Sequence, residues 1–320
     1  MVSISAKEKA RKPLVVILGP TAVGKSEVAI RIAEHLDGEV ISADSRLFYR
    51  GMDIGTAKPS LEDRQRVPHH LIDVADPDGV WSLVIFQQAA RRAIDAIHQK
   101  NRLPLLVGGT GQYIRAVVQA WDAPPVEPDP RLRFVLEAWK EEIGGQELHA
   151  RLAVLDPDAA AKIDPRNVRR TIRALEVIFS SGRKFSQQTK SGKTPFDLLQ
   201  IGLYRPRVEL YTRIDARIQA MLEAGFVDEV QNLLDNGYSP DLPTLSAIGY
   251  GEIIGYLEGK ISLEEAIVRI KRQTRIFVRR QANWFKKDDP NIAWFEMNPG
   301  IEHEIIAFVR GWLSRLDGGV

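Results

Sequence analysis

The sequence predicts an α/β fold: a doubly wound parallel sheet interrupted by a helical insertion. Short apolar segments alternate with amphipathic helical segments along much of the chain, which is the pattern of β-α-β units. Glycine-rich or polar turns follow these apolar segments, as they do at the carboxyl ends of parallel strands. A proline-rich segment, 121–130, then precedes a long stretch without strand signals.

The predicted strands are short runs of apolar residues. Residues 13–18 (PLVVIL) and 103–107 (LPLLV) are uninterrupted runs, typical of strands buried on both faces. Two further strands are expected at 39–43 and 198–203. Helices are expected at 25–36, 82–100, 113–120, 208–236 and 262–287.

These elements suggest the organisation of the chain. Residues 1–12 are small, polar and basic and are expected to form a flexible tail. The α/β core is expected over 13–121 and 198–320, because strand signals return at 198. Between them, 122–197 is expected to form the helical insertion domain.

Composition narrows the class of protein. The 320 residues are 44% hydrophobic and 27% charged, as in globular proteins. The absence of cysteine excludes disulfides and zinc–thiolate sites. No signal peptide or long apolar segment is present, so we expect a soluble, cytoplasmic protein. No large apolar face is left over, which favours a monomer.

Residues 19–26 form the most informative motif, which fits G-x-x-x-x-G-K-[ST] in full. The motif lies between a predicted strand and a predicted helix, so the core should resemble that of P-loop NTPases. Its backbone N–H groups and the helix N-terminus would surround a diphosphate, with a charge from Lys25 and a hydroxyl from Ser26 for Mg²⁺. The expected diphosphate-binding residues are Gly19, Pro20, Thr21, Ala22, Val23, Gly24, Lys25 and Ser26.

The loop alone leaves several enzyme classes open. A small-molecule kinase, a nucleotidase and a regulatory GTPase all bind nucleotides through such a loop. The N-K-x-D motif of GTPases is absent, and an ATP-driven helicase would need a second motor domain or arginine fingers from an oligomer. A kinase could use Asp44 as its base, although it would not explain the insertion.

Two other strand ends carry polar or flexible residues. Asp44 follows the strand 39–43, where it could act as a base, hold Mg²⁺ through water, or cap a turn. Gly108-Gly109-Thr110-Gly111 follows 103–107 and allows close backbone approach, or is a plain tight turn. These alternatives stay open at this point.

Two other segments could have a functional role or could be purely structural. Residues 50–59 could form a lid or a substrate loop with Lys58 near phosphate, or an ordinary surface loop. His69 and His70 are adjacent, but no third ligand lies at metal spacing, so a metal site is not expected there.

Two basic zones stand out in a chain of net charge +2. Residues 162–193 carry nine Lys and Arg against two acids, and 266–287 carry eight against none. A basic helix face can be merely solvated, but one without acids to pair with favours phosphates. We therefore expect a nucleic-acid site.

Six strings together resemble the tRNA dimethylallyltransferase family, also called tRNA isopentenyl transferases. They are GPTAVGKS, ISADSRLFYRGMDIGTAKP, PHHLID, VGGTGQYI, RALEV and LSAIGYGE, and the likeness runs from about residue 13 to 287. The resemblance implies a phosphate-loop core with a helical insertion, as expected from the strands and helices. It also implies transfer of a dimethylallyl group from dimethylallyl diphosphate to N6 of the adenosine at tRNA position 37, with release of diphosphate.

The resemblance also implies roles for individual residues. Asp44 would be the base, Thr110 would meet the adenosine or diphosphate, and Arg217 would reach the diphosphate from a later helix. Mg²⁺ would be the cofactor, held by Ser26 through the diphosphate. The residues expected to contact tRNA are Asp44, Ser45, Arg46, Leu47, Thr110, Arg169, Arg170, Thr171, Ile172, Arg173, Ser246, Gly249, Tyr250, Arg275, Arg279 and Arg280.

The sequence departs from the family pattern at two positions. Leu47 stands where many members have Gln, which puts a hydrogen bond to a neighbouring base in doubt. Ser26 replaces a common Thr and keeps the hydroxyl. Without cysteine, the chain lacks the zinc finger of eukaryotic members and resembles the bacterial type.

Two other functions compete with the expected one. An enzyme that prenylates free adenine nucleotides would share the loop but would not need the basic faces. A non-catalytic RNA-binding protein with structural ATP would leave Asp44 and Arg217 without a role.

Overall fold

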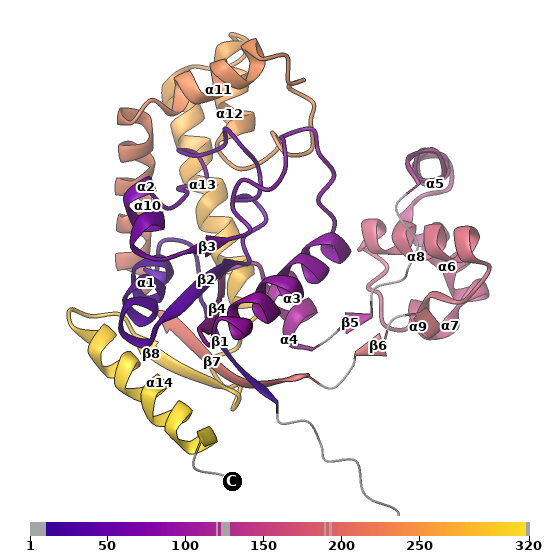
Figure 1. Ribbon diagram of the computed structural model, residues 1–320. Helices are drawn as coiled ribbons and strands as arrows, with labels where there is room; N and C mark the ends of the chain where they lie inside the picture. Colours follow the sequence, from indigo (N-terminus) through magenta and orange to yellow (C-terminus); the bar gives the residue numbers. More distant parts are fainter. Residues whose placement is uncertain (1–10, 120, 123–128, 189, 192–193, 318–320) are drawn as a thin grey trace, which may run out of the picture. The chain divides into compact units, whose positions relative to one another are not determined.

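The computed structural model describes residues 11–119, 121–122, 129–188, 190–191 and 194–317 (Figure 1). The chain divides into two compact units, one of residues 1–118 with 194–320 and the other of 119–193. Residues 1–10 of the expected tail lie outside the described residues, and Lys12 already belongs to the first strand.

The larger unit contains a six-stranded parallel sheet of order β3-β2-β4-β1-β7-β8. The predicted α/β fold is confirmed, and the four predicted strands are present at shifted bounds. The strands are β1 (Lys12–Leu18), β2 (Gly38–Ser42), β3 (His69–His70), β4 (Leu103–Gly108), β7 (Phe196–Tyr204) and β8 (Ile292–Glu296). The sequence did not predict β3 and β8.

The register of the central strands gathers their carboxyl ends. Leu18 of β1 is paired with Gly108 of β4 on one side and with Gly202 of β7 on the other. Ser42 at the end of β2 is paired with Val107. The loops that follow β1, β2 and β4 therefore meet at one edge of the sheet.

Several helices of the larger unit pack against this sheet, and others lie beyond its edge (Figure 1). Those near the predicted positions are α1 (Lys25–Leu36), α3 (Leu83–Gln99), α4 (Gly111–Val118), α10 (Arg207–Glu223), α11 (Phe226–Asp235) and α13 (Leu263–Ala282). The remaining helices are α2 (Leu61–Arg66), α12 (Tyr250–Leu257) and α14 (Ile301–Asp317). The single helix predicted over 208–236 is two helices, because Gly225 adopts a φ of 93° between them.

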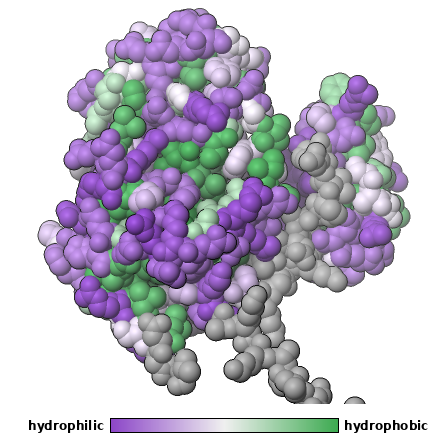
Figure 2. Space-filling view, viewed as in Figure 1, coloured by the Kyte–Doolittle hydropathy of each residue, from purple (hydrophilic) through white to green (hydrophobic). Residues whose placement is uncertain are grey.

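The surface of this unit is mainly hydrophilic in Figure 2, and hydrophobic residues collect toward the middle of the face shown. Among the described residues, no helix combines the length and the apolar composition that crossing a bilayer would require.

The smaller unit has its own hydrophobic core. Its helices are α5 (Pro130–Ile143), α6 (Gly145–Leu155), α7 (Pro157–Ala160), α8 (Val168–Ser181) and α9 (Phe185–Gln188). Leu136, Leu148, Leu152 and Leu175 are buried between them. A short antiparallel pair, β5 (Trp121–Asp122) and β6 (Lys190–Ser191), also belongs to this unit. The core was expected to extend to residue 121, and no strand was expected at 190–191. The insertion was expected to end at 197, but Phe196 already begins β7.

Candidate active site

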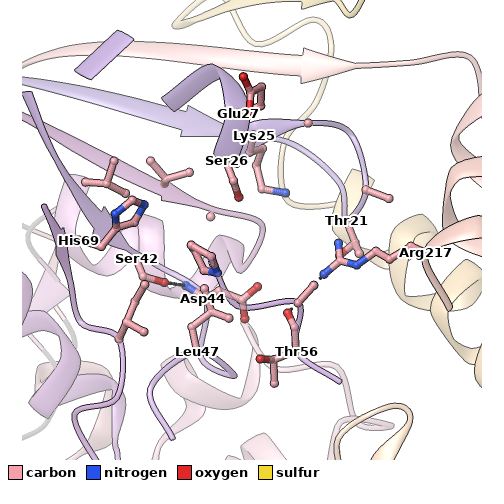
Figure 3. Close-up of a pocket in the computed structure, with 18 of the residues that line it drawn as sticks. Thr21, Lys25, Ser26, Glu27, Ser42, Asp44, Leu47, Thr56, His69 and Arg217 are labelled. Carbon is pink, nitrogen blue, oxygen red and sulfur yellow. Dashed lines mark hydrogen bonds between the residues drawn. The ribbon is translucent and has the colours of Figure 1, made fainter. Parts of the chain in front are cut away.

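A cavity of about 550 Å³ lies at the carboxyl edge of the sheet (Figure 3). The loop after β1, the loop after β2 and one side of α10 enclose it. Among its lining residues are Thr21, Ala22, Gly24, Lys25, Ser26, Glu27, Ser42, Asp44, Leu47, Thr56, His69, Gly108, Arg213 and Arg217.

The diphosphate loop, residues 19–26, has the backbone that an anion cradle requires. Gly19 has a φ of 150° and Gly24 a φ of 113°, both in the region that favours glycine. A Cβ at Gly19 would lie 2.6 Å from the carbonyl oxygen of Leu203, so a side chain there would displace β7. Gly24 precedes α1 without a side-chain cap, which leaves the first N–H groups of the helix available to a ligand.

Lys25 brings a buried positive charge to this loop. Its Nζ donates a hydrogen bond of 2.8 Å to the carbonyl oxygen of Pro20. Burial lowers the pKa of Lys25 to about 8, an effect that Asp44 opposes and Arg217 strengthens. Because water solvates this buried ammonium poorly, its electrostatic attraction to a bound diphosphate should be strong.

Arg217 approaches the same cavity from α10. Its Nη2 donates to the carbonyl oxygen of Thr56 at 3.3 Å, and its buried Nε has no hydrogen-bond partner among the described residues. Burial lowers the pKa of Arg217, while Asp44 acts in the opposite direction. A guanidinium with an unused buried donor is suited to bind an anion.

The sequence prediction did not name Arg213, one helical turn before Arg217. Arg213 also lines the cavity, and its Nε donates to the carbonyl oxygen of Ala22 at 2.9 Å. Its spacing of four residues from Arg217 on a predicted helix was the available signal.

The structure places Asp44 both in a turn and at the cavity. Its Oδ1 accepts a hydrogen bond of 3.0 Å from the backbone N–H of Arg46, which caps the turn after β2. The same carboxylate lines the cavity, and Figure 3 shows it between Leu47 and Arg217. A carboxylate held by a turn and open to a cavity is suited to accept a proton from a bound group.

The glycine-rich turn after β4 packs closely against its neighbours. Gly108 lines the cavity, and a Cβ there would lie 2.6 Å from the carbonyl oxygen of Ala43. The carbonyl oxygen of Thr110 accepts bonds from the N–H groups of Tyr113 and Ile114 and so starts α4. Thr110 is not among the residues that line the cavity. Its role toward substrate stays a prediction.

Gln281 of α13 was also missed by sequence reasoning. It is 5% exposed, its Oε1 accepts from the N–H of Thr21 at 2.9 Å, and its Nε2 donates to the carbonyl oxygen of Gly109 at 3.2 Å. In the sequence it is only an uncharged polar residue inside the basic zone 266–287, so its contacts could not be inferred.

Residues 50–59 are anchored rather than free. The carboxylate of Glu229 accepts hydrogen bonds from the N–H groups of Asp53, Ile54 and Gly55. The ammonium of Lys58, nearly fully buried, bonds to the carbonyl of Tyr49 and pairs with Asp53 and Asp73. Of the two alternatives, a Lys58 free to bind phosphate is not found, because its charge is paired with Asp53 and with Asp73 outside the loop.

The two adjacent histidines are each hydrogen-bonded to a neighbouring group of the fold. His70 Nε2 lies 2.7 Å from the buried carboxylate of Glu39, and His69 Nδ1 lies 2.7 Å from the carbonyl of Val67. Among the described residues no group of three His, Asp or Glu could hold a metal ion.

The basic zones are partly paired, contrary to the expectation from sequence. Arg275 bonds to Asp215 of α10 at 2.6 Å, and Arg269 pairs with Glu265 one turn away. In the smaller unit, Arg173 pairs with the buried Glu176 at 2.8 Å. Exposed cations remain at Arg169, Arg170, Arg279 and Arg280.

Several residues expected to contact tRNA are buried instead. Thr171 and Ile172 pack inside the smaller unit, on the inner face of α8. Tyr250 is fully buried, and its hydroxyl donates to Glu229 at 2.6 Å. A buried side chain has no surface that RNA could contact. The expectation that these three side chains contact tRNA is therefore wrong. Gly249 is buried too.

The other residues expected near tRNA lie on or near the surface. Ser246 is exposed, and Ser45, Arg46 and Leu47 are half-buried. Arg46 donates to the carbonyl oxygen of Thr244 at 3.2 Å, which fixes the turn after β2 to a distant loop.

Comparison with known proteins shows the family to which the chain is related. The model of the family described as IPP transferase matches residues 47–288. A tRNA dimethylallyltransferase of Roseiflexus sp. (strain RS-1) is 49% identical over 303 residues, or 94% of this chain and 99% of that protein. One from Dehalococcoides mccartyi (strain ATCC BAA-2266 / KCTC 15142 / 195) is 43% identical over 96% of this chain and 94% of its own length.

Solved structures give the same result. The full-length tRNA isopentenylpyrophosphate transferase of Bacillus halodurans has a TM-score of 0.72 at 43% identity, covering 96% of this chain and 98% of that one. A eukaryotic dimethylallyltransferase acting on tRNA has a TM-score of 0.81 at 29% identity, covering 95% of this chain and 80% of its own. With its fold, its phosphate loop and these relatives in agreement, the chain belongs to the IPP transferase family.

Proposed function

We propose that this protein is a tRNA dimethylallyltransferase. It moves a dimethylallyl group from dimethylallyl diphosphate to N6 of an adenosine next to the anticodon. The observation that carries the proposal is the convergence of Lys25, Arg217 and Asp44 on one cavity. Two cations suit the diphosphate that leaves, and the carboxylate suits the amine that attacks.

The leaving group would occupy the diphosphate loop. As the allylic C–O bond breaks, its electron pair passes to the diphosphate oxygen, so negative charge grows there. The backbone N–H groups at the start of α1, the ammonium of Lys25 and the guanidinium of Arg217 are donors already in place for this charge. Interactions that strengthen as charge develops favour the transition state over the bound substrate.

The acceptor is the exocyclic amine of adenine, a weak nucleophile because its lone pair is delocalised into the ring. Asp44 would accept an N6–H proton while N6 bonds to C1 of the allyl group. Its capping bond from Arg46 uses Oδ1, which leaves Oδ2 for the amine. The target base must leave the RNA stack, at a cost of roughly a few kcal/mol.

The residues present fit a magnesium ion bound through the diphosphate. The Ser26 side chain lines the cavity beside Lys25, while the described residues form no acidic cluster that would hold a metal without substrate. When bound, Mg²⁺ would neutralise charge on the diphosphate.

The RNA would be held by exposed basic residues on both units. Arg169 and Arg170 lie on α8 of the smaller unit, and Arg279 and Arg280 lie at the end of α13. Contacts from such residues to phosphates supply affinity without reading sequence.

One experiment tests the function directly. The protein is incubated with dimethylallyl diphosphate, Mg²⁺ and an unmodified anticodon stem-loop RNA that carries adenosines around the target. We expect prenylated adenosine in the nucleoside digest by mass spectrometry. Absence of the product at every salt concentration would overturn the proposal. Prenylation of AMP, ADP or ATP at the rate seen with RNA would instead favour a nucleotide prenyltransferase.

A further inference from the structure

The side-chain amide of Gln281 joins two loops that follow different strands. On one side it accepts the N–H of Thr21 in the diphosphate loop, after β1. On the other it donates to the carbonyl of Gly109, in the turn after β4. Both polar atoms of the amide are therefore used, and each partner belongs to a loop at the edge of the cavity.

Close packing leaves this amide little freedom. A Cβ at Gly109 would lie 2.4 Å from Nε2 of Gln281, so only glycine permits this approach. Two residues further on, where α4 begins, a Cβ at Gly111 would lie 2.4 Å from the ring of Trp284. Arg115 of α4 donates to the carbonyl of Trp284 at 2.7 Å and stacks over its ring. The end of α13 is thus fixed to the turn after β4 at several points.

We infer that Gln281 is a positioning residue, which sets the spacing between the diphosphate loop and the loop beside the acceptor. This rests on the proposed function, in which the first loop holds the leaving group and Asp44 receives the acceptor. Gly108, where the turn after β4 begins, packs against Ala43, the residue before Asp44. N6 must meet C1 of the allyl group opposite the breaking C–O bond. An error of about 1 Å in such an alignment can cost about 100-fold in rate.

The spacing between the two loops also affects which nucleophile receives the allyl group. If the acceptor amine is held too far away, water can attack C1 instead. That reaction consumes water and dimethylallyl diphosphate and yields dimethylallyl alcohol, diphosphate and a proton, so no further reactant is needed. Gln281 then determines how the donor divides between prenylated RNA and alcohol.

The test uses two variants of the full-length protein and one control. Gln281→Met keeps the length of the side chain and removes both hydrogen bonds, whereas Gln281→Glu keeps an acceptor for Thr21 but loses the donor to Gly109. Gln273→Met is the control, since Gln273 is exposed on the same helix. The readouts are kcat, the KM for the donor, the Kd for RNA, the midpoint of thermal unfolding and the ratio of alcohol to prenylated RNA.

For Gln281→Met we expect kcat to fall about 100-fold and the alcohol fraction to rise, with the Kd for RNA within about threefold of the parent. Gln281→Glu should lie between Gln281→Met and the parent in kcat, because one bond is retained. A parent-like kcat and alcohol fraction in Gln281→Met would overturn the inference. A second result would also overturn it. In that result, Gln281→Met loses kcat only because it unfolds at the assay temperature, and Gln281→Glu, which stays folded, divides the donor between RNA and water as the parent does. A parent protein that makes no prenylated RNA would instead refute the proposed function.

Discussion

Arg217 donates a hydrogen bond from Nη2 to the main-chain carbonyl of Thr56 at 3.3 Å, across 161 residues of chain. The bond ties α10 to the segment anchored by Glu229 and aims the guanidinium at the cavity. The nitrogen Nε remains buried without a partner in the described part of the chain. A bound diphosphate would supply the missing acceptor.

Replacement of Arg217 should therefore impair chemistry more than folding. For Arg217→Gln we expect kcat/KM for the donor to fall about 100- to 1,000-fold, the range seen when one donor to a developing oxyanion is removed. Steady-state kinetics at saturating RNA measures this. Arg310→Gln on α14, where the side chain is exposed, is the matched loss of one positive charge and should behave as the parent.

Asp44→Asn should separate chemistry from binding. The amide oxygen can still accept from the N–H of Arg46, so the turn is kept, but the side chain can no longer take a proton. We expect the single-turnover rate to fall about 100- to 10,000-fold and the Kd for RNA to change little. A parent-like rate in this variant would show that Asp44 is not the base.

The pKa of Lys25, about 8, predicts the pH dependence of donor capture. The protonated ammonium attracts the diphosphate, and it predominates below pH 8 in the free protein. As the pH rises through this value the charge is lost, so kcat/KM for the donor should decrease by up to about tenfold per pH unit. Because bound diphosphate favours the charged form, kcat at saturating donor should break at a higher pH.

The variant Lys25→Met tests whether Lys25 causes this change of kcat/KM with pH. Its kcat/KM should be low throughout and should lack the change near pH 8. An identical pH profile in the parent and in Lys25→Met would assign the titration to another group.

Removal of the two exposed arginines of α8 should weaken RNA binding through phosphate contacts. For Arg169→Ala with Arg170→Ala, we expect the slope of log K against log salt to decrease in magnitude by about 1.5 to 2, if each contacts one phosphate. Filter binding over a range of salt concentrations measures the slope. Arg151→Ala is the control, because Arg151 pairs with Glu147 on α6. An unchanged slope would exclude these phosphate contacts.

Glu229 should be a stability determinant rather than a catalytic one. Glu229→Ala leaves three N–H groups at residues 53–55 and the hydroxyl of Tyr250 without their acceptor. We expect a loss of about 3 to 5 kcal/mol in the free energy of unfolding, measured by urea denaturation. Glu229→Gln should lose less, since the amide oxygen still accepts. An equal loss in both variants would mean that packing, not the carboxylate, supplies the stability.

Local patterns in the sequence predicted much of this protein. The helix from Lys25 to Leu36 depends on contacts within a few residues, so its periodicity indicates it. The run 13–18 and the motif 19–26 are indicated by their apolar composition and glycine placement, although the strand itself pairs with β4 and β7. Asp44 and Gly108 could be placed near the loop as well, because parallel strands bring their carboxyl ends to one edge. β8 was missed although it is a partner of β7 in the sheet.

The tertiary structure alone decided which polar groups serve the cavity and which serve the fold. The sequence leaves Lys58 open to phosphate, yet Asp53 and Asp73 neutralise its charge. The family resemblance implies that Tyr250 contacts RNA, yet its side chain is buried beside Glu229. Conversely, Arg213 and Gln281 lie on late helices and reach the diphosphate loop only because α10 and α13 pack beside it. Such contacts join residues that lie about 190 and 260 positions apart, and local propensity carries no information about partners at that separation.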